Sequence, residues 1–196
     1  MKKYSGFTLI ELIITMALVG VLLTIGVPSL KRFMQGSQLI STTNELLSAL
    51  HITRSEAVKL NSKVTICSSS DGKSCSGSTD WSNGWIVFVD ANDDQAGTEE
   101  ECATIDTDCL LRVQEAVSDD QLTVTGVDSN KSAIKSFTFS ARGLPTISKV
   151  SRSGTFSVCS FDESDNLINS RAVVLSLSGR VRVSENAAVI TCPSSP

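Results

Sequence analysis

The chain is poor in the residues on which most enzyme chemistry depends, histidine above all. Its 196 residues contain one histidine, His51. A metal site built from several histidines is therefore excluded, and a histidine-based catalytic triad would depend on this one residue in a helical context. The sequence also lacks a Gly-x-Ser-x-Gly elbow and a Walker phosphate-binding loop. We expect neither an enzymatic activity nor a cofactor.

Charge is scarce as well, and the whole chain has no excess of positive charge. Charged residues make up 19% of the sequence, hydrophobic residues 41%, and the formal net charge is −4. This composition excludes a charge-rich disordered chain and supplies enough apolar residues for one ordinary domain with an appendage. Because a strongly basic field is missing, binding to nucleic acid would require a local basic patch.

The sequence does contain an even number of cysteines, all of which follow the N-terminal apolar segment: Cys67, Cys75, Cys102, Cys109, Cys159 and Cys192. They indicate disulfides in an oxidising compartment. Zinc is the alternative, but the intervals within the two close pairs exceed the roughly two to four residues usual between zinc ligands, and no histidine lies near. The most local connectivity pairs each cysteine with the next one along the chain, and other connectivities stay open.

The N-terminal segment Phe7–Leu30 contains one charge, Glu11, and is long enough for a membrane helix of about 20 residues. Lys2 and Lys3 precede it, so the positive-inside rule places the rest of the chain on the far side of the membrane, where cysteines are oxidised. A cleaved secretory signal peptide is the alternative. Its apolar core would be about 7 to 15 residues long and would end at a small-x-small site. This segment is longer and runs through Pro28 into another helical pattern.

Glu11 is unusual in such a segment, since a carboxylate costs about 2.5 kcal/mol or more at the bilayer centre and less towards its edge. An acid at this depth therefore indicates a function. The alternative is that its side chain reaches the membrane interface.

The residues Ser5–Leu12 resemble the class III signal of type IV prepilins and type II secretion pseudopilins. The resemblance implies that a prepilin peptidase cleaves after Gly6 and methylates the new N-terminus at Phe7, so that the apolar helix is retained. It also implies that Glu11 neutralises the N-terminal ammonium of a neighbouring subunit, because two buried opposite charges are tolerable only as a pair. Pro28 matches the proline that kinks the family's helix by removing a hydrogen bond.

Two further segments, Trp81–Asp90 and Ser178–Arg182, look like the GspH/FimT branch of minor pilins and pseudopilins, whereas Gly97–Cys109 looks like an acidic insertion. The resemblance implies a minor type IV pilin at the pilus tip or in a priming complex. Such a protein crosses the inner membrane once, with its head in the periplasm, and becomes extracellular on the pilus. Its partners would be other pilins and minor pilins, the prepilin peptidase and the inner membrane. A type II secretion pseudopilin is another possibility.

The expected fold class is α+β and pilin-like, with a long N-terminal helix packed on an antiparallel β-rich head. We expect a cleaved leader at 1–6, a helix at 7–60 and a disulfide-stapled head at 61–196. Within the helix, residues 7–30 would lie in the membrane or filament core, and residues 31–60 would be amphipathic. The amphipathic part has apolar residues at three- and four-residue steps, namely Leu39, Leu46, Leu50, Ala57 and Leu60, with His51 and Arg54 on its polar or boundary face.

Short apolar or alternating runs in the head predict eight or nine strands in one or two antiparallel sheets. The predicted strands are Lys63–Cys67, Trp85–Asp90, Leu110–Val117, Gln121–Thr125, Ile134–Ser140, Thr155–Cys159, Arg171–Leu177, Val181–Ser184 and Ala187–Cys192. Glycines mark the turns at Arg142-Gly143 and Ser178-Gly179, among others.

Charge is distributed unevenly along the head. Acids dominate between Asp90 and Asp120, and bases dominate between Lys131 and Arg182. Within Gly179–Arg182, two arginines alternate in a predicted strand and so share one face, where they can grip successive phosphates. FimT-like members are associated with DNA binding through a Gly-Arg-x-Arg motif that these four residues match. The resemblance therefore implies double-stranded DNA as a partner in natural transformation, through Arg180 and Arg182. The local excess of bases adds Lys149, Arg152 and Arg171 as further candidate DNA-binding residues. A solvated basic edge, or a contact between subunits, is the alternative.

A second candidate site lies in the acidic region. The residues Asp90, Asn92, Asp94 and Glu101 approximate the spacing of oxygen ligands in a calcium loop. Gln95 stands where such a loop needs a glycine, so a solvated acidic loop is the alternative to calcium binding.

Overall fold

The computed structural model describes residues 8–92, 94, 102, 107–117, 119–147 and 151–193. The chain divides into two compact units, Met1–Ser37 and Gln38–Pro196. The predicted leader and the first mature residue, Phe7, lie outside the described residues.

Helix α1 (Leu9–Leu60) belongs to both units and is the helix that the apolar N-terminal pattern predicts. It begins after Thr8, whose Oγ1 accepts a hydrogen bond from the Glu11 backbone N–H at 3.3 Å, as an N-cap residue does. Pro28 lies inside the helix, which continues through it. At the other end Asn61 adopts a left-handed conformation with φ 51°, and the N–H of Ser62 bonds back to the Ala57 carbonyl at 3.2 Å, so the chain leaves the helix there.

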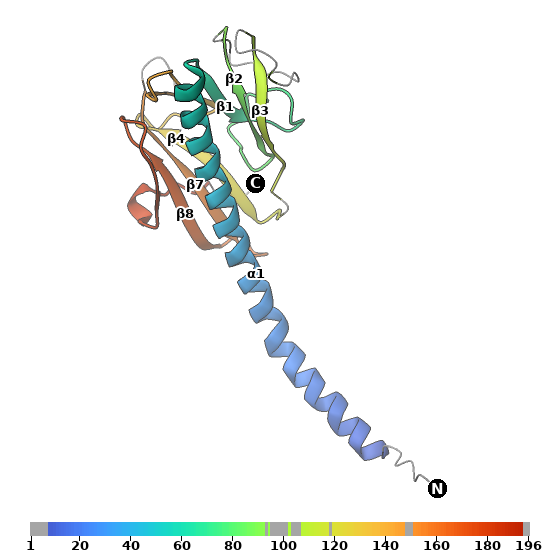
Figure 1. Cartoon of the computed structure of the whole chain (residues 1–196). Coiled ribbons are helices and arrows are strands. Elements are labelled where there is room, and N and C mark those ends of the chain that lie inside the picture. Colours follow the sequence, from blue (N-terminus) through green and yellow to red (C-terminus); the bar gives the residue numbers. More distant parts are fainter. Residues whose placement is uncertain are drawn as a thin grey trace. The chain divides into compact units, whose positions relative to one another are not determined.

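The second unit contains two antiparallel sheets (Figure 1). The five-stranded sheet has the order β3-β2-β1-β5-β6, and the four-stranded sheet has the order β4-β7-β8-β9. The strands are β1 Val64–Ser68, β2 Trp85–Val89, β3 Cys109–Gln114, β4 Leu122–Asp128, β5 Ser136–Phe139, β6 Pro145–Thr146, β7 Gly154–Phe161, β8 Leu167–Leu175 and β9 Val181–Ser184.

One hydrophobic core receives side chains from α1 and from both sheets. The predicted helix stripe is confirmed, since Leu39, Leu46, Leu50 and Ala57 are each 0% exposed. Trp81 lies in the connection between β1 and β2 and packs on the four-stranded sheet: its backbone N–H donates to the Val124 carbonyl of β4, and its ring meets Phe156 of β7 edge-on. Its Nε1 donates to the Ile134 carbonyl at 2.8 Å. The α+β architecture expected from the sequence, a long N-terminal helix with an antiparallel β-rich head, is therefore present.

Two of the predicted strands need correction. Residues Ala187–Val189 form a short 3-10 helix and the following residues are irregular, so the expected strand Ala187–Cys192 is wrong. The physical reason is that this segment bonds to a side chain of the sheet and not to the backbone of an edge strand: the N–H of Thr191 donates to Ser157 Oγ on β7. Strand β8 begins at Leu167, before the predicted Arg171, and β6 was not predicted because it has only two residues.

Candidate functional site

The first unit offers an apolar surface rather than a pocket. Every described residue from Thr8 to Met34 is exposed, including Leu18 at 59% and Leu22 at 69%. Glu11 lies in the first turn of α1 and is also exposed. This helix is long and apolar enough to cross a membrane. Of the predicted processing and assembly residues, Glu11 and Pro28 are thus placed on α1, and Gly6 and Phe7 lie outside the described residues.

Three disulfides lie in the second unit, and they are the pairs of the most local connectivity. Cys67 of β1 is joined to Cys75, Cys102 to Cys109 of β3, and Cys159 of β7 to Cys192. The first bond closes a loop in which Asp71 accepts hydrogen bonds from the backbone N–H and the hydroxyl of Ser74 and from the N–H of Lys73. These donors, with the Ser74 N–H contributing most, hold the pKa of Asp71 far below its ordinary value.

Arg180 and Arg182 are both exposed at one edge of the four-stranded sheet. Arg182 is in β9, opposite Val174 of β8, and Arg180 immediately precedes the strand. Between them Val181 is only 6% exposed and belongs to the core. Since side chains alternate along a strand, the two guanidiniums share the outer face, as the sequence predicted.

Arg171, predicted for the same surface, is not brought to it. In β8 it is three residues from Val174, so it lies on the opposite face of the sheet from Arg182. Its Nη2 makes an ion pair with Glu185 Oε1 at 2.7 Å, so the positive charge of Arg171 already has a partner within the protein. Lys149 lies outside the described residues.

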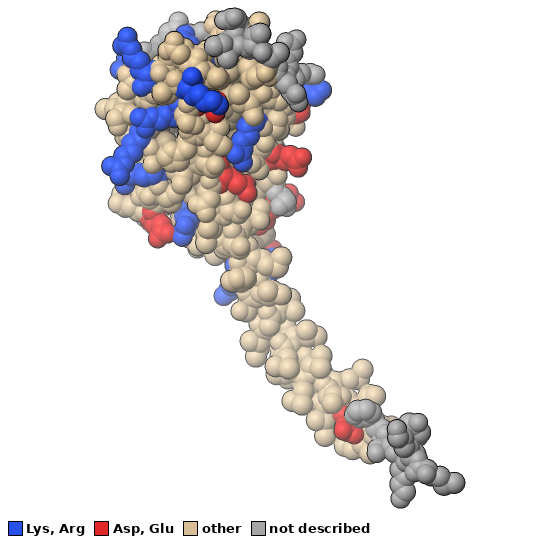
Figure 2. Space-filling view, viewed as in Figure 1, with Lys and Arg blue, Asp and Glu red and all other residues tan. Residues whose placement is uncertain are grey.

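Arg152 is exposed and lines a groove of about 520 Å³ beside the end of α1, together with Lys63 of the α1–β1 connection and Arg142 of the β5–β6 turn. On the face shown in Figure 2, Lys and Arg side chains gather over the side of the second unit where β8 lies in Figure 1. Arg142 was not among the predicted binding residues, although its neighbour Gly143 marks a predicted turn. No sequence signal places this turn beside Arg152.

Arg54 of α1 is a second residue for which the sequence predicted no binding or assembly role. Its Nη1 donates to the Gly179 carbonyl at 3.0 Å and its Nη2 to the Ser178 carbonyl at 3.4 Å. These bonds attach the β8–β9 turn, and hence the start of the Gly-Arg-x-Arg motif, to the helix. Gly179 has φ 77°, and a Cβ there would collide with the Gly143 carbonyl oxygen, so only glycine fits.

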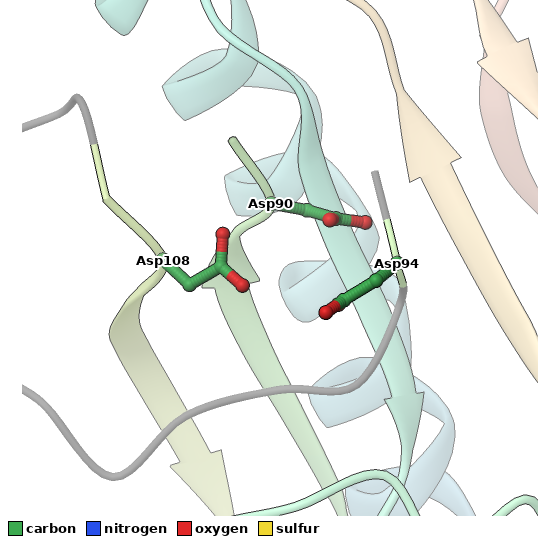
Figure 3. A group of neighbouring side chains, drawn as sticks. All are labelled: Asp90, Asp94 and Asp108. Carbon is green, nitrogen blue, oxygen red and sulfur yellow. The ribbon is translucent and has the colours of Figure 1, made fainter. Parts of the chain in front are cut away.

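The predicted acidic site is arranged differently from a loop with ligands in sequence. Carboxylate oxygens of Asp90, Asp94 and Asp108 all lie within 4.8 Å of one another (Figure 3). Asp108 was not predicted; the pairing of Val89 with Cys109 carries it beside Asp90. Asn92 donates from Nδ2 to Asp94 Oδ2 at 2.9 Å, and Glu101 lies outside the described residues.

Parts of this acidic group already have hydrogen bonds. Asp90 Oδ2 accepts from Thr65 Oγ1 at 2.8 Å, and Asp108 Oδ1 accepts from the Ala91 N–H at 2.9 Å. Carboxylate oxygens are the ligands that calcium prefers, so calcium binding by this group stays a prediction, with Asp108 added to its residues.

Comparison with known proteins gives two family matches. The model of the type II transport protein GspH matches residues 42–179, which is more than half of the chain. The model of the prokaryotic N-terminal methylation motif matches residues 1–27. No curated protein matches the chain significantly.

Similar solved structures include two crystal forms of the type IV minor pilin FimU from Pseudomonas aeruginosa strain PAO1. The P21 form is 21% identical, with a TM-score of 0.49, over 78% of this chain and 92% of that chain. The P65 form is 21% identical, with a TM-score of 0.47, over 74% and 90%. The minor pseudopilin EpsH of the type 2 secretion system of Vibrio cholerae is 10% identical, with a TM-score of 0.49, over 76% of this chain and 97% of that chain.

Proposed function

Because this chain belongs to the GspH family of pilins and pseudopilins, we propose that it is a minor type IV pilin, built into the pilus tip or a priming complex by its N-terminal helix. In this proposal the prepilin peptidase cleaves after Gly6 and methylates Phe7. The second unit then faces the periplasm and, after assembly, the outside of the cell.

The observation that carries the proposal is the surface of the first part of α1. Its residues are exposed on all sides from Thr8 to Met34, and no charged residue lies between Leu12 and Leu30. A helix that is apolar all round needs an apolar environment on every side, either lipid or other helices. A pilin occupies both environments in turn: before assembly its helix lies in the lipid of the inner membrane, and after assembly it packs among the helices of the filament.

Glu11 has a specific part in this proposal. After cleavage each subunit carries an ammonium on Phe7, and in an apolar filament core that charge needs a counter-charge. The carboxylate of Glu11 in the neighbouring subunit supplies it. One axial offset between two subunits brings the charges together, so the pair selects the register of assembly.

The test is incorporation of a Glu11→Ala variant into sheared pili, with Glu115→Ala as the matched control. Glu115 is an exposed acid of the second unit, so its loss changes net charge equally without touching α1. We expect Glu11→Ala to abolish recovery of the subunit in the pilus fraction while its amount in the membrane is unchanged. Recovery equal to that of Glu115→Ala would refute the assembly role.

A deletion strain separates the pilus from the type II secretion alternative. Loss of surface pili with normal secretion of exoproteins is the expected result. Loss of secretion with normal piliation would instead assign the chain to the secretion system as a pseudopilin.

A second function, capture of double-stranded DNA during natural transformation, is favoured by one observation: Arg180 and Arg182 are both exposed on one face at a sheet edge. Guanidiniums in that arrangement suit phosphate contacts without base readout. The test compares duplex binding by the oxidised full chain in non-ionic detergent with that of Arg180→Gln/Arg182→Gln. Binding that weakens with salt and is lost in the variant supports the function; equal binding by the variant refutes the role of these arginines.

A further inference from the structure

Two turns of the second unit, far apart in sequence, have the same hydrogen-bond pattern. In the turn Ser140–Leu144 the N–H of Gly143 donates to the Ser140 carbonyl at 2.8 Å, and Ser140 Oγ accepts from the Leu144 N–H at 3.3 Å. In the turn Ser176–Arg180 the N–H of Gly179 donates to the Ser176 carbonyl at 2.9 Å, and Ser176 Oγ accepts from the Arg180 N–H at 3.1 Å. Both turns are therefore fixed by a serine at the first position and a glycine at the fourth.

The two turns touch each other and the helix. A Cβ on Gly179 would collide with the Gly143 carbonyl oxygen, because the two backbones are in direct contact. A Cβ on Gly143 would lie 3.1 Å from the Arg54 Nε, and a Cβ on Gly179 would lie 3.4 Å from it. Arg54 is thus packed against both glycines and holds the second turn through its bonds to the Ser178 and Gly179 carbonyls.

The contact between the two turns fixes the backbone positions of two arginines. Arg142 precedes Gly143 and Arg180 follows Gly179, so each is one residue from the point of contact between the turns. Both side chains are exposed. Exposed arginines therefore follow and precede the contact between the turns, with Arg180 and Arg182 on one turn and strand and Arg142 on the other turn.

Arg142 also lines the groove of about 520 Å³ that it shares with Arg152 and Lys63. The hydroxyl-bearing residues Ser62, Ser140 and Thr146 also line the groove. Among the described residues that line it, the acid is Asp90, which is 0% exposed and accepts a hydrogen bond from Thr65. A groove with this lining suits an anion whose oxygens can each accept more than one hydrogen bond.

We propose that this groove is a second phosphate-binding subsite, in which Arg142 and Arg152 hold the backbone of the same duplex that Arg180 and Arg182 contact. The inference rests on the proposed DNA-binding function and extends it. Arg54 is a positioning residue, since it joins the two turns that carry Arg142 and Arg180. Contacts to phosphate carry no sequence information, so the extended site binds duplexes of different sequence equally.

The experiment measures duplex binding across a salt series with four forms of the oxidised full chain in non-ionic detergent: the unaltered protein, Arg142→Gln/Arg152→Gln, Arg180→Gln/Arg182→Gln and Lys131→Gln/Lys135→Gln. The last is the matched control, because it removes two exposed positive charges elsewhere on the second unit. Near-ultraviolet circular dichroism checks that each variant retains the fold.

We expect Arg142→Gln/Arg152→Gln to bind at least about tenfold more weakly than the control variant at low salt. The slope of log K against log salt should fall by about one for each phosphate that the variant no longer neutralises. Because the glutamines keep the turns intact, the circular dichroism should not change. Inorganic phosphate should compete with the duplex less effectively in this variant than in the unaltered protein.

The outcomes separate the two proposals. If Arg180→Gln/Arg182→Gln loses binding but Arg142→Gln/Arg152→Gln matches the lysine control, the second subsite is refuted and the DNA-binding function stands. If the unaltered protein does not bind duplex at any salt, both are refuted. If Arg142→Gln/Arg152→Gln loses only its sensitivity to inorganic phosphate, the groove binds a small anion and the proposed duplex contact is wrong.

Discussion

The two parts of helix α1 share one backbone geometry and are both rich in leucine, yet their side chains have opposite environments. In the part before Ser37, Leu18 and Leu22 are 59% and 69% exposed. In the part after it, Leu46 and Leu50 are 0% exposed. A leucine on a helix is therefore not buried by its own hydrophobicity but by what the rest of the protein places against it.

The polar residues explain the difference. After Ser37, exposed polar residues such as Ser41, His51 and Ser55 alternate with the buried stripe. This part of the helix therefore has one apolar face, which the sheets cover, and one polar face, which water can solvate. Before Ser37 the hydroxyls of Thr15 and Thr24 bond to the helix itself: Thr24 Oγ1, for example, donates to the Val21 carbonyl at 2.8 Å. A helix without a polar face requires cover on all sides, which the chain does not contain within the described residues.

The largest expected effect comes from removing one leucine from each part. Leu50→Ala should lower the free energy of unfolding by about 2–5 kcal/mol, because it opens a cavity in the shared core. Leu22→Ala should leave it unchanged, since that side chain is 69% exposed and removing it opens no cavity among the described residues. Denaturant unfolding followed by the fluorescence of the buried Trp81 and Trp85 measures both. Equal losses in the two variants would contradict the comparison.

The next effect sharpens the comparison with two arginines of α1. Arg54→Ala should lower the free energy of unfolding by about 1.5–3 kcal/mol, because two carbonyls of the β8–β9 turn lose a charged donor. Arg32→Ala, at an exposed position in the other part of the helix, should have no effect on unfolding. Arg54→Lys serves as an intermediate variant that keeps the charge. Unfolding energies for Arg54→Ala and Arg32→Ala that do not differ would show that the turn needs no support from α1.

The smallest effect concerns acid stability, to which the second unit contributes through Asp71 and Asp162. The backbone N–H of Asn166, above all, lowers the pKa of Asp162, as Ser74 lowers that of Asp71. A lowered pKa adds stability that is present above the ordinary value of 3.8 and is lost as pH falls through the value in the folded protein. Thermal melts at neutral and acid pH should therefore show a smaller acid loss for Asp71→Asn and Asp162→Asn than for the unaltered protein. An unchanged acid loss in both variants would contradict this origin.

Local patterns predicted the elements well and their edges poorly. The stripe of Leu39, Leu46 and Leu50 was predictable because helical periodicity repeats within a few residues. Strand Ala187–Cys192 was predicted wrongly because an apolar alternation also suits a segment that lies over a sheet and is held there by the Cys159–Cys192 bond. Alternation reports which side is covered and does not report a strand partner.

The basic residues show the same limit. The exposure of Arg180 and Arg182 on one face followed from two-residue alternation in a strand. That Arg171 lies on the other face, paired with Glu185, depended on the register between β8 and β9, which no local pattern contains. The contact between the turns at Gly143 and Gly179 joins residues with no relation in sequence.

The sequence by itself determined the apolar helix with its single acid and the α+β class, because each depends on patterns that repeat within a few turns or strands. It specified the spacing of the cysteines and left their pairing open. Tertiary structure alone decided which residues surround the motif: it brought Arg54 and the turn that carries Arg142 to the start of Gly-Arg-x-Arg and placed Arg171 on the opposite face of the sheet. Side chains distant in sequence become neighbours only through sheet register and the packing of turns on a helix, and those are set by the whole core rather than by any one segment.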